Sequence, residues 1–484
     1  MKYKGKDYMM CDAWHLNVDE RIHVFNLKLP GTTENMSVAH AYTDDLLHFK
    51  TCDDILPPLK DENLPEDYLD KWTGCAVTAP NGDHYIYYTM RNKAQSQKIG
   101  LAITKDLENF ELYKGNPVLV PDKNVFAYTG ASDIKEDCRD MVIVWDDASE
   151  RYYGYFAAMS DDDDRYTGVI GVAESTDLLN WSNQKVVYKP RFDGIMEVPD
   201  VFYLDGKWWL TALTHTSFGA KGTLSDQNVL SGTIYASSDS PVGPFIEGED
   251  NIFIGGTHSS GYTCRTFIYK GKRYVMYIDK SKDEWAVSLP KEVCVVDGNL
   301  RPCYTEILQK LRVKELVKNL TPDMLSKQSS SIAWNVGNSD VSQETNEISI
   351  TTNPYTYQHH IIKDVEARAA EIECGLELKC VEGGFYIVSN KSEYYITANT
   401  NEKTLTVYEK GRDFIPFSRR NFNFNCGQEY NIRVIALEGQ IEVYVDDVLV
   451  IQNAFETGEI MKFGLITGCG ESKFKNFKLY ELEN

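Results

Sequence analysis

The chain has 484 residues, enough for two or three domains, and 42% of them are hydrophobic. This composition is that of a folded globular protein, and it excludes a collagen-like repeat or wholesale disorder. The chain has 72 acidic and 50 basic residues, so its formal net charge is −22, and this charge repels nucleic-acid phosphates.

The N-terminal segment MKYKGKDYMMCDAW has basic residues but no apolar signal-peptide core, and no stretch reaches the roughly 18 apolar residues of a membrane span. The eleven cysteines include no CxxC pair, so neither a disulfide framework nor a thiolate zinc site is predicted. We therefore expect a cytoplasmic protein with reduced thiols and with no membrane or nucleic-acid partner.

A hairpin turn followed by an aromatic-rich strand recurs five times. The copies are anchored, at spacings of 63, 67, 56 and 66 residues, on Ile22, Tyr85, Tyr152, Trp208 and Tyr274. A second repeat, Asp-Leu-x-x-aromatic, occupies 45–49, 106–110 and 177–181. A period near 60 residues with several strands in each unit predicts a five-bladed β-propeller over residues 1–300.

After the fifth repeat, apolar residues at helical spacing predict a short helical connector over residues 301–319. From residue 320 to 484 the sequence returns to alternating strands, with Asp446-Asp447 as one turn, which predicts a C-terminal β-sandwich. The expected fold is all-β, a propeller followed by a sandwich.

The first strand of each propeller blade lines the central channel. Residues ten to twelve positions before the five anchors should therefore face one pocket. They are Asp12, Gly74 with Cys75, Asp140, Glu197, and Thr263 with Cys264. Three of the five positions carry a carboxylate, each among apolar neighbours.

Convergent carboxylates and aromatic rings predict a glycosidase, in which one acid protonates the leaving oxygen while another stabilises or attacks the sugar cation. The aromatic residues proposed as sugar platforms are Trp14, Trp72, Trp145 and Tyr128. Arg265 is a further polar contact at the ring, and Cys75 is either a pocket wall or a small buried hydrophobe.

At these positions the chain resembles glycoside hydrolase family 32, the fructan and sucrose hydrolases. Arg139-Asp140 is similar to the family's Arg-Asp-Pro motif, and Glu197 to the acid of its Glu-Cys motif. Asp12 precedes the segment 23–25 much as the family's Asp-Pro-Asn-Gly nucleophile precedes its His-Leu-Phe strand. Three departures stand out: Ala13-Trp14-His15 replaces Pro-Asn-Gly, Met141 replaces Pro, and Val198 replaces Cys.

The resemblance implies a retaining fructosidase that releases terminal fructose from sucrose, short fructo-oligosaccharides or related fructosides. Asp12 would be the nucleophile, Glu197 the acid and base, and Asp140 the transition-state stabiliser with Arg139 as its charge partner. Trp72 stands in a stretch that matches a wall of the family's fructose pocket. No cofactor or metal is implied.

Other functions stay open at this stage. The same fold serves arabinofuranosidases and xylosidases, a fructosyltransferase would use the same covalent intermediate, and the departures after Asp12 also fit a non-catalytic sugar-binding protein. The sandwich could cover a blade edge, bind sugar or join two copies into a homo-oligomer. The acidic run 161–164 is expected in a solvated loop, and His359-His360 has no third ligand at zinc spacing.

Overall fold

The computed structural model is all-β and divides into two compact units, residues 2–255 with 261–302 and residues 303–484. The structure describes residues 2–29, 36–56, 70–92, 96–127, 137–160, 167–191, 194–215, 231–255, 261–280, 285–328, 338–354, 356–410, 416–455 and 460–484. Across these ranges, no helix is both long and apolar enough to span a membrane.

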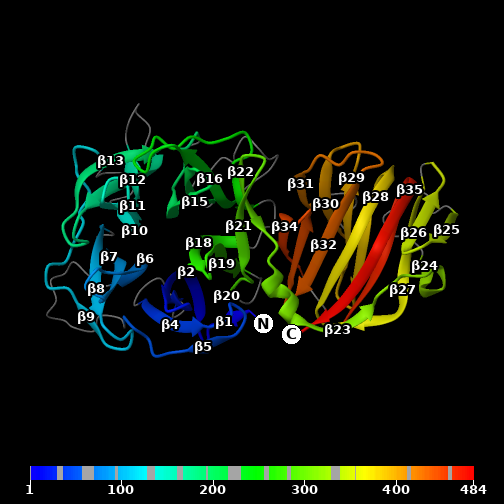
Figure 1. Cartoon of the computed structure of the whole chain (residues 1–484), viewed down its shortest axis with the longest axis horizontal. Helices are drawn as coiled ribbons and strands as arrows, with labels where there is room; N and C mark the ends of the chain where they lie inside the picture. Colours follow the sequence, from blue (N-terminus) through cyan, green and yellow to red (C-terminus); the bar gives the residue numbers. More distant parts are fainter. Residues whose placement is uncertain are drawn as a thin grey trace. The chain divides into compact units, whose positions relative to one another are not determined.

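Four-stranded antiparallel sheets follow one another in the N-terminal unit, and in each the strands pair in chain order (Figure 1). The first sheet contains β2 (Met9–Val18), β3 (Arg21–Leu29), β4 (Ser37–Thr43) and β5 (Phe49–Thr51). The second contains β6 (Asp70–Thr78), β7 (His84–Arg91), β8 (Gln97–Thr104) and β9 (Phe110–Leu112). The third contains β10 (Cys138–Asp146), β11 (Arg151–Ser160), β12 (Thr167–Ser175) and β13 (Ser182–Tyr188). The fourth contains β14 (Glu197–Leu204), β15 (Lys207–His215), β16 (Ser231–Ser238) and β17 (Ile252–Gly255).

A further antiparallel group completes the N-terminal unit. It contains β18 (Gly261–Tyr269), β19 (Lys272–Lys280), β20 (Trp285–Val287), β21 (Lys291–Val296) and β22 (Asn299–Cys303). The N-terminal strand β1 (Tyr3–Lys4) pairs with β20, where Tyr3 lies opposite Val287. The first and last segments of the unit are therefore joined in one sheet.

The first strands of the successive sheets contact one another in a closed series: β2 with β6, β6 with β10, β10 with β14, β14 with β18, and β18 with β2. Apolar clusters fill the spaces between neighbouring sheets, as where Tyr87 of β7 and Phe156 of β11 belong to one cluster. The sheets lie around a common centre (Figure 1), so the N-terminal unit is a β-propeller.

The Asp-Leu-x-x-aromatic repeat forms the same turn in three sheets, between the third and fourth strands. At Asp177, the carboxylate accepts hydrogen bonds from the backbone N–H groups of Leu179 (2.9 Å) and Asn180 (2.8 Å), while Ser175 Oγ accepts one from Leu178 N (3.0 Å). The leucine after the aspartate has a positive φ in each copy, 66° at Leu178. Side-chain acceptors thus stabilise a backbone conformation that leucine rarely adopts.

The C-terminal unit is built on two long paired strands, β28 (Ala370–Ser389) and β35 (Met461–Leu482). The first half of β28 also pairs with β32 (Glu429–Leu437), which continues to β33 (Gln440–Val445) and β34 (Val448–Ala454). Its second half pairs with β29 (Glu393–Asn399), which continues to β30 (Thr404–Glu409) and β31 (Pro416–Asn421). The remaining strands are β23 (Arg312–Val317), β24 (Leu325–Gln328), β25 (Ser339–Glu344), β26 (Glu347–Thr352) and β27 (Tyr357–Ala367).

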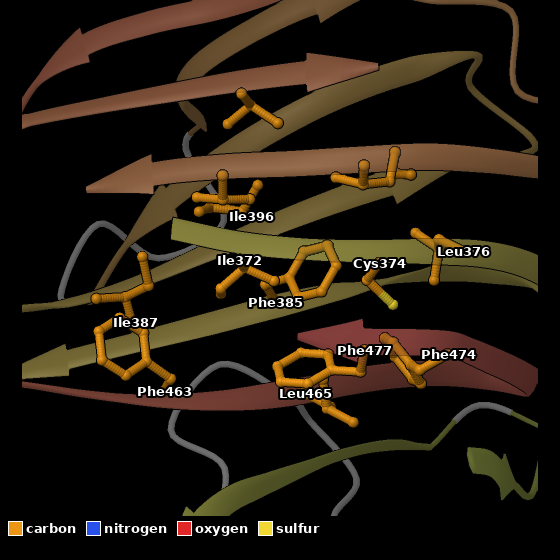
Figure 2. Close-up of a cluster of buried hydrophobic side chains, with 14 of the residues drawn as sticks. Ile372, Cys374, Leu376, Phe385, Ile387, Ile396, Phe463, Leu465, Phe474 and Phe477 are labelled. Atoms are coloured by element: carbon orange, nitrogen blue, oxygen red, sulfur yellow. The ribbon is translucent and has the colours of Figure 1, made fainter. Parts of the chain in front are cut away.

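Both halves of β28 send side chains into the same core. Figure 2 shows Ile372 of the first half beside Phe385 of the second, with Leu465 and Phe477 of β35 nearby. All four side chains are at most 2% exposed. Alternating apolar residues on these strands therefore build one core for the whole unit.

The connector differs from the predicted helix. Its helical part is the 3-10 helix Glu306–Leu311, capped by Thr305 Oγ1, which accepts a hydrogen bond from Ile307 N (3.4 Å). Strands β22 and β23 flank this helix. The apolar residues Leu308 and Leu311, three positions apart, suit a helix of three residues per turn and are both buried.

Asp279 in β19 forms an ion pair with Lys2, and both side chains are 2% exposed. We expect Asp279→Ala to lower the free energy of unfolding by about 3 kcal/mol, because the Lys2 ammonium would stay buried without this carboxylate. Urea unfolding measures the loss. The matched control is Asp54→Ala, which removes the exposed pair with Lys28 (3.0 Å) and should cost less than about 1 kcal/mol. Equal losses in the two variants would contradict this account.

Candidate functional site

Each of the five inner strands has a register irregularity at a matching position. The irregularities fall between Cys11 and Ala13, Trp72 and Gly74, Arg139 and Val142, Glu197 and Asp200, and Tyr262 and Arg265. A β-bulge re-aims side chains and interrupts pairing, and bulges are enriched beside active sites. The strands that line the centre of the propeller are thus irregular at corresponding positions along their length.

Four residues at these irregularities have positive φ values: Asp12 (40°), Asp140 (58°), Val198 (46°) and Thr263 (51°). This backbone region is uncommon for non-glycine residues and is strained for the β-branched Val198 and Thr263. Because the strained residues lie on four neighbouring strands, the strain is concentrated at the centre of the propeller, which makes this centre the candidate site.

Asp12 is partly buried and is held by two side-chain donors. Thr73 donates its hydroxyl hydrogen to Asp12 Oδ2, and the Cys11 thiol donates to Oδ1 at 3.0 Å. Burial raises the pKa of Asp12, and the negative charge of Glu197 adds to this effect. The hydrogen bonds from Thr73 and Cys11, together with the charge of Arg265, act in the opposite direction.

Arg139 joins the other two predicted carboxylates. Its Nε lies 3.6 Å from Asp140 Oδ2 and 3.8 Å from Glu197 Oε1, while Nη2 donates to the carbonyl oxygen of Met196 at 2.8 Å. Asp140 Oδ2 also accepts a hydrogen bond from Val198 N (3.0 Å). One guanidinium therefore fixes the strands β10 and β14 at the place where their acids meet.

The pKa of Asp140 is raised to about 7, mainly by burial. The charges of Glu197 and Asp12 contribute to this rise, whereas the charge of Arg139 and the Val198 hydrogen bond oppose it. The three predicted carboxylates therefore belong to one electrostatic cluster. Glu197 keeps 19% of its side chain exposed, so it is accessible from solvent, whereas the side chain of Asp140 is only 6% exposed.

The sequence profile of the N-terminal domain of glycosyl hydrolases family 32 matches residues 15–285, more than half of the chain. The chain belongs to family 32 of the glycosyl hydrolases. Asp140 and Glu197 lie inside the matched region, and Asp12 lies just before it. Comparison with curated protein sequences gives no match.

Solved structures of other proteins share the fold over the whole chain. A β-fructofuranosidase of Bombyx mori is 17% identical with a TM-score of 0.70, and the match covers 100% of this chain and 93% of the other. Fructan 1-exohydrolase IIa of Cichorium intybus is 14% identical with a TM-score of 0.72 and coverages of 100% and 97%. Sucrose-6-phosphate hydrolase of Lactobacillus gasseri is 14% identical with a TM-score of 0.71 and coverages of 100% and 93%. Variants of the first two were solved with sucrose and with 1-kestose, respectively.

Arg265, predicted as a polar sugar contact, ties the inner strands of this family 32 propeller together. It is 3% exposed, and its guanidinium donates to the carbonyl oxygens of Asp140 (2.9 Å) and Pro199. The side chain thus connects β18 to β10 and β14. Its hydrogen bonds go to the backbone that forms the bulges, which gives it a structural role at the site.

The predicted aromatic platforms occupy different environments. Trp14 is 1% exposed and packs in the core with Phe25, so neither ring face is free. Trp72 is partly buried, and the Arg91 guanidinium lies 4.6 Å from its ring centre. Trp145 lies at the hairpin end of β10, 43% exposed and against Tyr152. Tyr128 lies outside the described residues.

Cys75 is 6% exposed in the cluster between the second and third sheets, and burial raises the pKa of its thiol to about 12. It is therefore a buried hydrophobic residue in this structure. The acidic run 161–164 lies outside the described residues. His359 and His360 are buried in the C-terminal unit, and the described part of the chain has no group of three or more side chains arranged to hold a metal ion.

Sequence reasoning missed three residues of the site: Thr73, Asp137 and Tyr262. Thr73 is the bulged residue of β6, one position before the predicted Gly74, and Asp137 pairs with Arg139. Burial raises the pKa of Tyr262, and the charges of Asp12, Glu197 and Asp140 raise it further. Thr73 and Tyr262 lie within one or two positions of the residues that the repeat spacing selects, so this spacing could have identified them. No repeat or motif in the sequence indicates the pairing of Asp137 with Arg139.

The raised pKa of Asp140 predicts a pH-dependent stability. Because the folded state holds a proton up to about pH 7 and an exposed aspartate only up to about pH 4, Asp140 lowers stability as pH rises through this window. We expect Asp140→Asn to gain stability relative to the native chain between pH 4 and 7, on the order of a few kcal/mol. Urea unfolding at several pH values measures the difference in free energy of unfolding between the variant and the native chain. A difference that does not change between pH 4 and 7 would contradict the prediction.

Asp177 serves as the control of opposite sign. Burial acts to raise the pKa of Asp177, but the hydrogen bonds from Asn180 and Leu179 outweigh burial and lower it to about 2. The stability that this group supplies is therefore present above pH 4 and is lost as pH falls towards 2. We expect the penalty of Asp177→Asn to be full above pH 4 and to shrink below it in the same urea experiment.

Proposed function

We propose that this family 32 chain is a retaining fructosidase that removes terminal fructose from sucrose, short fructo-oligosaccharides or related fructosides. One observation carries the proposal: matched bulges in β2, β10 and β14 bring Asp12, Asp140 and Glu197 into one electrostatic cluster, in which Arg139 lies within 4 Å of the last two. The names and ligands of solved relatives, which refer to fructofuranosidase, sucrose, fructan and 1-kestose, support the choice of substrate class.

In the first step of this mechanism, Asp12 attacks the anomeric carbon of fructose and forms a covalent ester. The bond to the leaving oxygen breaks as Glu197 transfers its proton to that oxygen. Thr73 and Cys11, which both donate to the Asp12 carboxylate, hold it in one orientation before the attack.

In the second step, water attacks the same carbon and Asp12 departs as a carboxylate. Glu197, now ionised, takes the proton from the water, which restores the starting protonation state. Asp140 lies beside Arg139 and would accept hydrogen bonds from sugar hydroxyl groups. The partial exposure of Glu197 fits a group that meets both the leaving sugar and the incoming water.

We also infer that β18–β21 with β1 form a fifth blade and that the C-terminal unit is a β-sandwich. The contacts of β18 with both β14 and β2 support the first inference. The shared core of the two halves of β28, each with its own set of further strands, supports the second. The cytoplasmic location and a homo-oligomer through this unit stay predictions.

Proton NMR of the products tests the function. The substrates are sucrose, 1-kestose, inulin- and levan-type oligosaccharides, difructose anhydrides and arabinofuranosides, each followed from the first minutes of reaction. We expect fructose released with its anomeric configuration retained. Inversion or release of arabinose would instead indicate the pentofuranosidase class. New fructosyl oligosaccharides would indicate a transferase, and binding without any product would indicate a sugar-binding protein.

Variants of the two acids test the assignment of residues. Glu197→Gln and Asp12→Asn should each lower kcat/KM by about a thousandfold or more, because neither amide can transfer a proton or attack carbon as a carboxylate does. The exposed carboxylate variant Asp54→Asn is the matched control and should keep full turnover. Unchanged turnover in either of the two acid variants would refute that residue's role.

A further inference from the structure

The Arg139 guanidinium has a fourth partner that the proposed mechanism does not use. Asp137, immediately before β10, is 6% exposed and accepts a hydrogen bond from Arg139 Nη1. The other terminal nitrogen donates to the Met196 carbonyl (2.8 Å). Both terminal nitrogens of the guanidinium are thus hydrogen-bonded, and its Nε lies 3.6 Å from Asp140 Oδ2 and 3.8 Å from Glu197 Oε1.

Because the guanidinium is planar, hydrogen bonds at its two terminal nitrogens also fix the orientation of its Nε. Without the Asp137 contact, the Met196 carbonyl would be the only acceptor that the described residues place at the two terminal nitrogens of Arg139, and the guanidinium could turn about that single hydrogen bond. The short distance between Asp137 and Arg139 in the chain, two residues within the same segment, means that the anchor moves together with the bulge of β10.

Asp137 also changes the charge balance of the site. Three carboxylates, those of Asp137, Asp140 and Glu197, lie within 4 Å of Arg139, and the charge of Arg265 acts on the pKa of Asp12. In this cluster the four acids outnumber the two guanidiniums. Because Arg139 is shared with Asp137, its charge is only partly available to stabilise the ionised form of Asp140.

We propose that Asp137 is a positioning residue for the glycosidase reaction: it locks Arg139 with its Nε edge towards Asp140 and Glu197 and moderates the positive charge that these two acids experience. The inference rests on the proposed function for its kinetic consequence. Asp137 acts through Arg139 and is not assigned a contact with the sugar.

A double-mutant cycle tests this indirect action. Asp137→Asn should lower kcat/KM tenfold to a hundredfold in the native background but less than twofold in an Arg139→Gln background, because the second variant has already removed the group that Asp137 holds. Losses that multiply independently in the double variant would overturn the proposal. Asp177→Asn, a variant of an exposed turn, should behave the same in both backgrounds.

The pH profile adds a readout that a merely structural role would not move. With one negative charge fewer in the cluster, both limbs of the kcat/KM profile of Asp137→Asn should move to lower pH. Unfolding midpoints measured in parallel show whether the variant is folded under the assay conditions. A folded variant with reduced kcat/KM and an unshifted profile would overturn the moderating role of Asp137.

A carboxyl carbon-13 NMR titration tests the same proposal without substrate. In protein labelled at aspartate, with the Asp140 signal assigned by its loss in Asp140→Asn, the Asp137→Asn variant should titrate Asp140 at lower pH than the native chain. An unchanged titration would overturn the proposal. If the native chain released no product from any fructoside, the proposed function would fail, while this titration would still decide the role of Asp137.

Discussion

The burial of several carboxylates at one point is the constraint on which the centre of this propeller depends. Ionised acids are expensive to remove from water unless cations and hydrogen-bond donors surround them. Arg139 and Arg265 supply the cations, and the Val198 backbone N–H and the Thr73 hydroxyl supply donors. Where this compensation is incomplete, the pKa of Asp140 rises to about 7, so one acid can stay protonated at neutral pH.

The bulges allow these groups to converge. A regular strand would place successive side chains on opposite faces of a sheet, so neighbouring residues such as Arg139 and Asp140 would point apart. The irregular register of β10 keeps both side chains within one charge cluster, at 3.6 Å from each other. The strained backbone at Asp140 and Val198 is stabilised by hydrogen bonds between strands: Asp140 N donates to Thr89 Oγ1 (2.9 Å) and Val198 N donates to Asp140 Oδ2 (3.0 Å).

Closure of the ring holds these strands in place. The N-terminal strand β1 pairs with β20 near the end of the unit, and the buried ion pair between Lys2 and Asp279 ties the same two regions together. The ring closes where β2 contacts β18. If these two strands separated, Asp12 of β2 would move away from Arg265 of β18. The contact that closes the ring therefore links the stability of the fold to the geometry of the acid cluster.

Local repeats in the sequence were sufficient to predict the all-β propeller and the matched positions of Asp12, Asp140 and Glu197, because hairpins depend on neighbouring residues. Contacts between distant residues were not predictable from these repeats. Thr73 meets Asp12 across 61 positions, and Arg265 reaches the Asp140 carbonyl across 125. Only the closed ring of sheets decides such contacts, and for this reason Arg265 connects neighbouring strands and Trp14 lies in the core. Asp137 is only two positions from Arg139, but it belongs to the site because Arg139 also reaches Asp140 and Glu197.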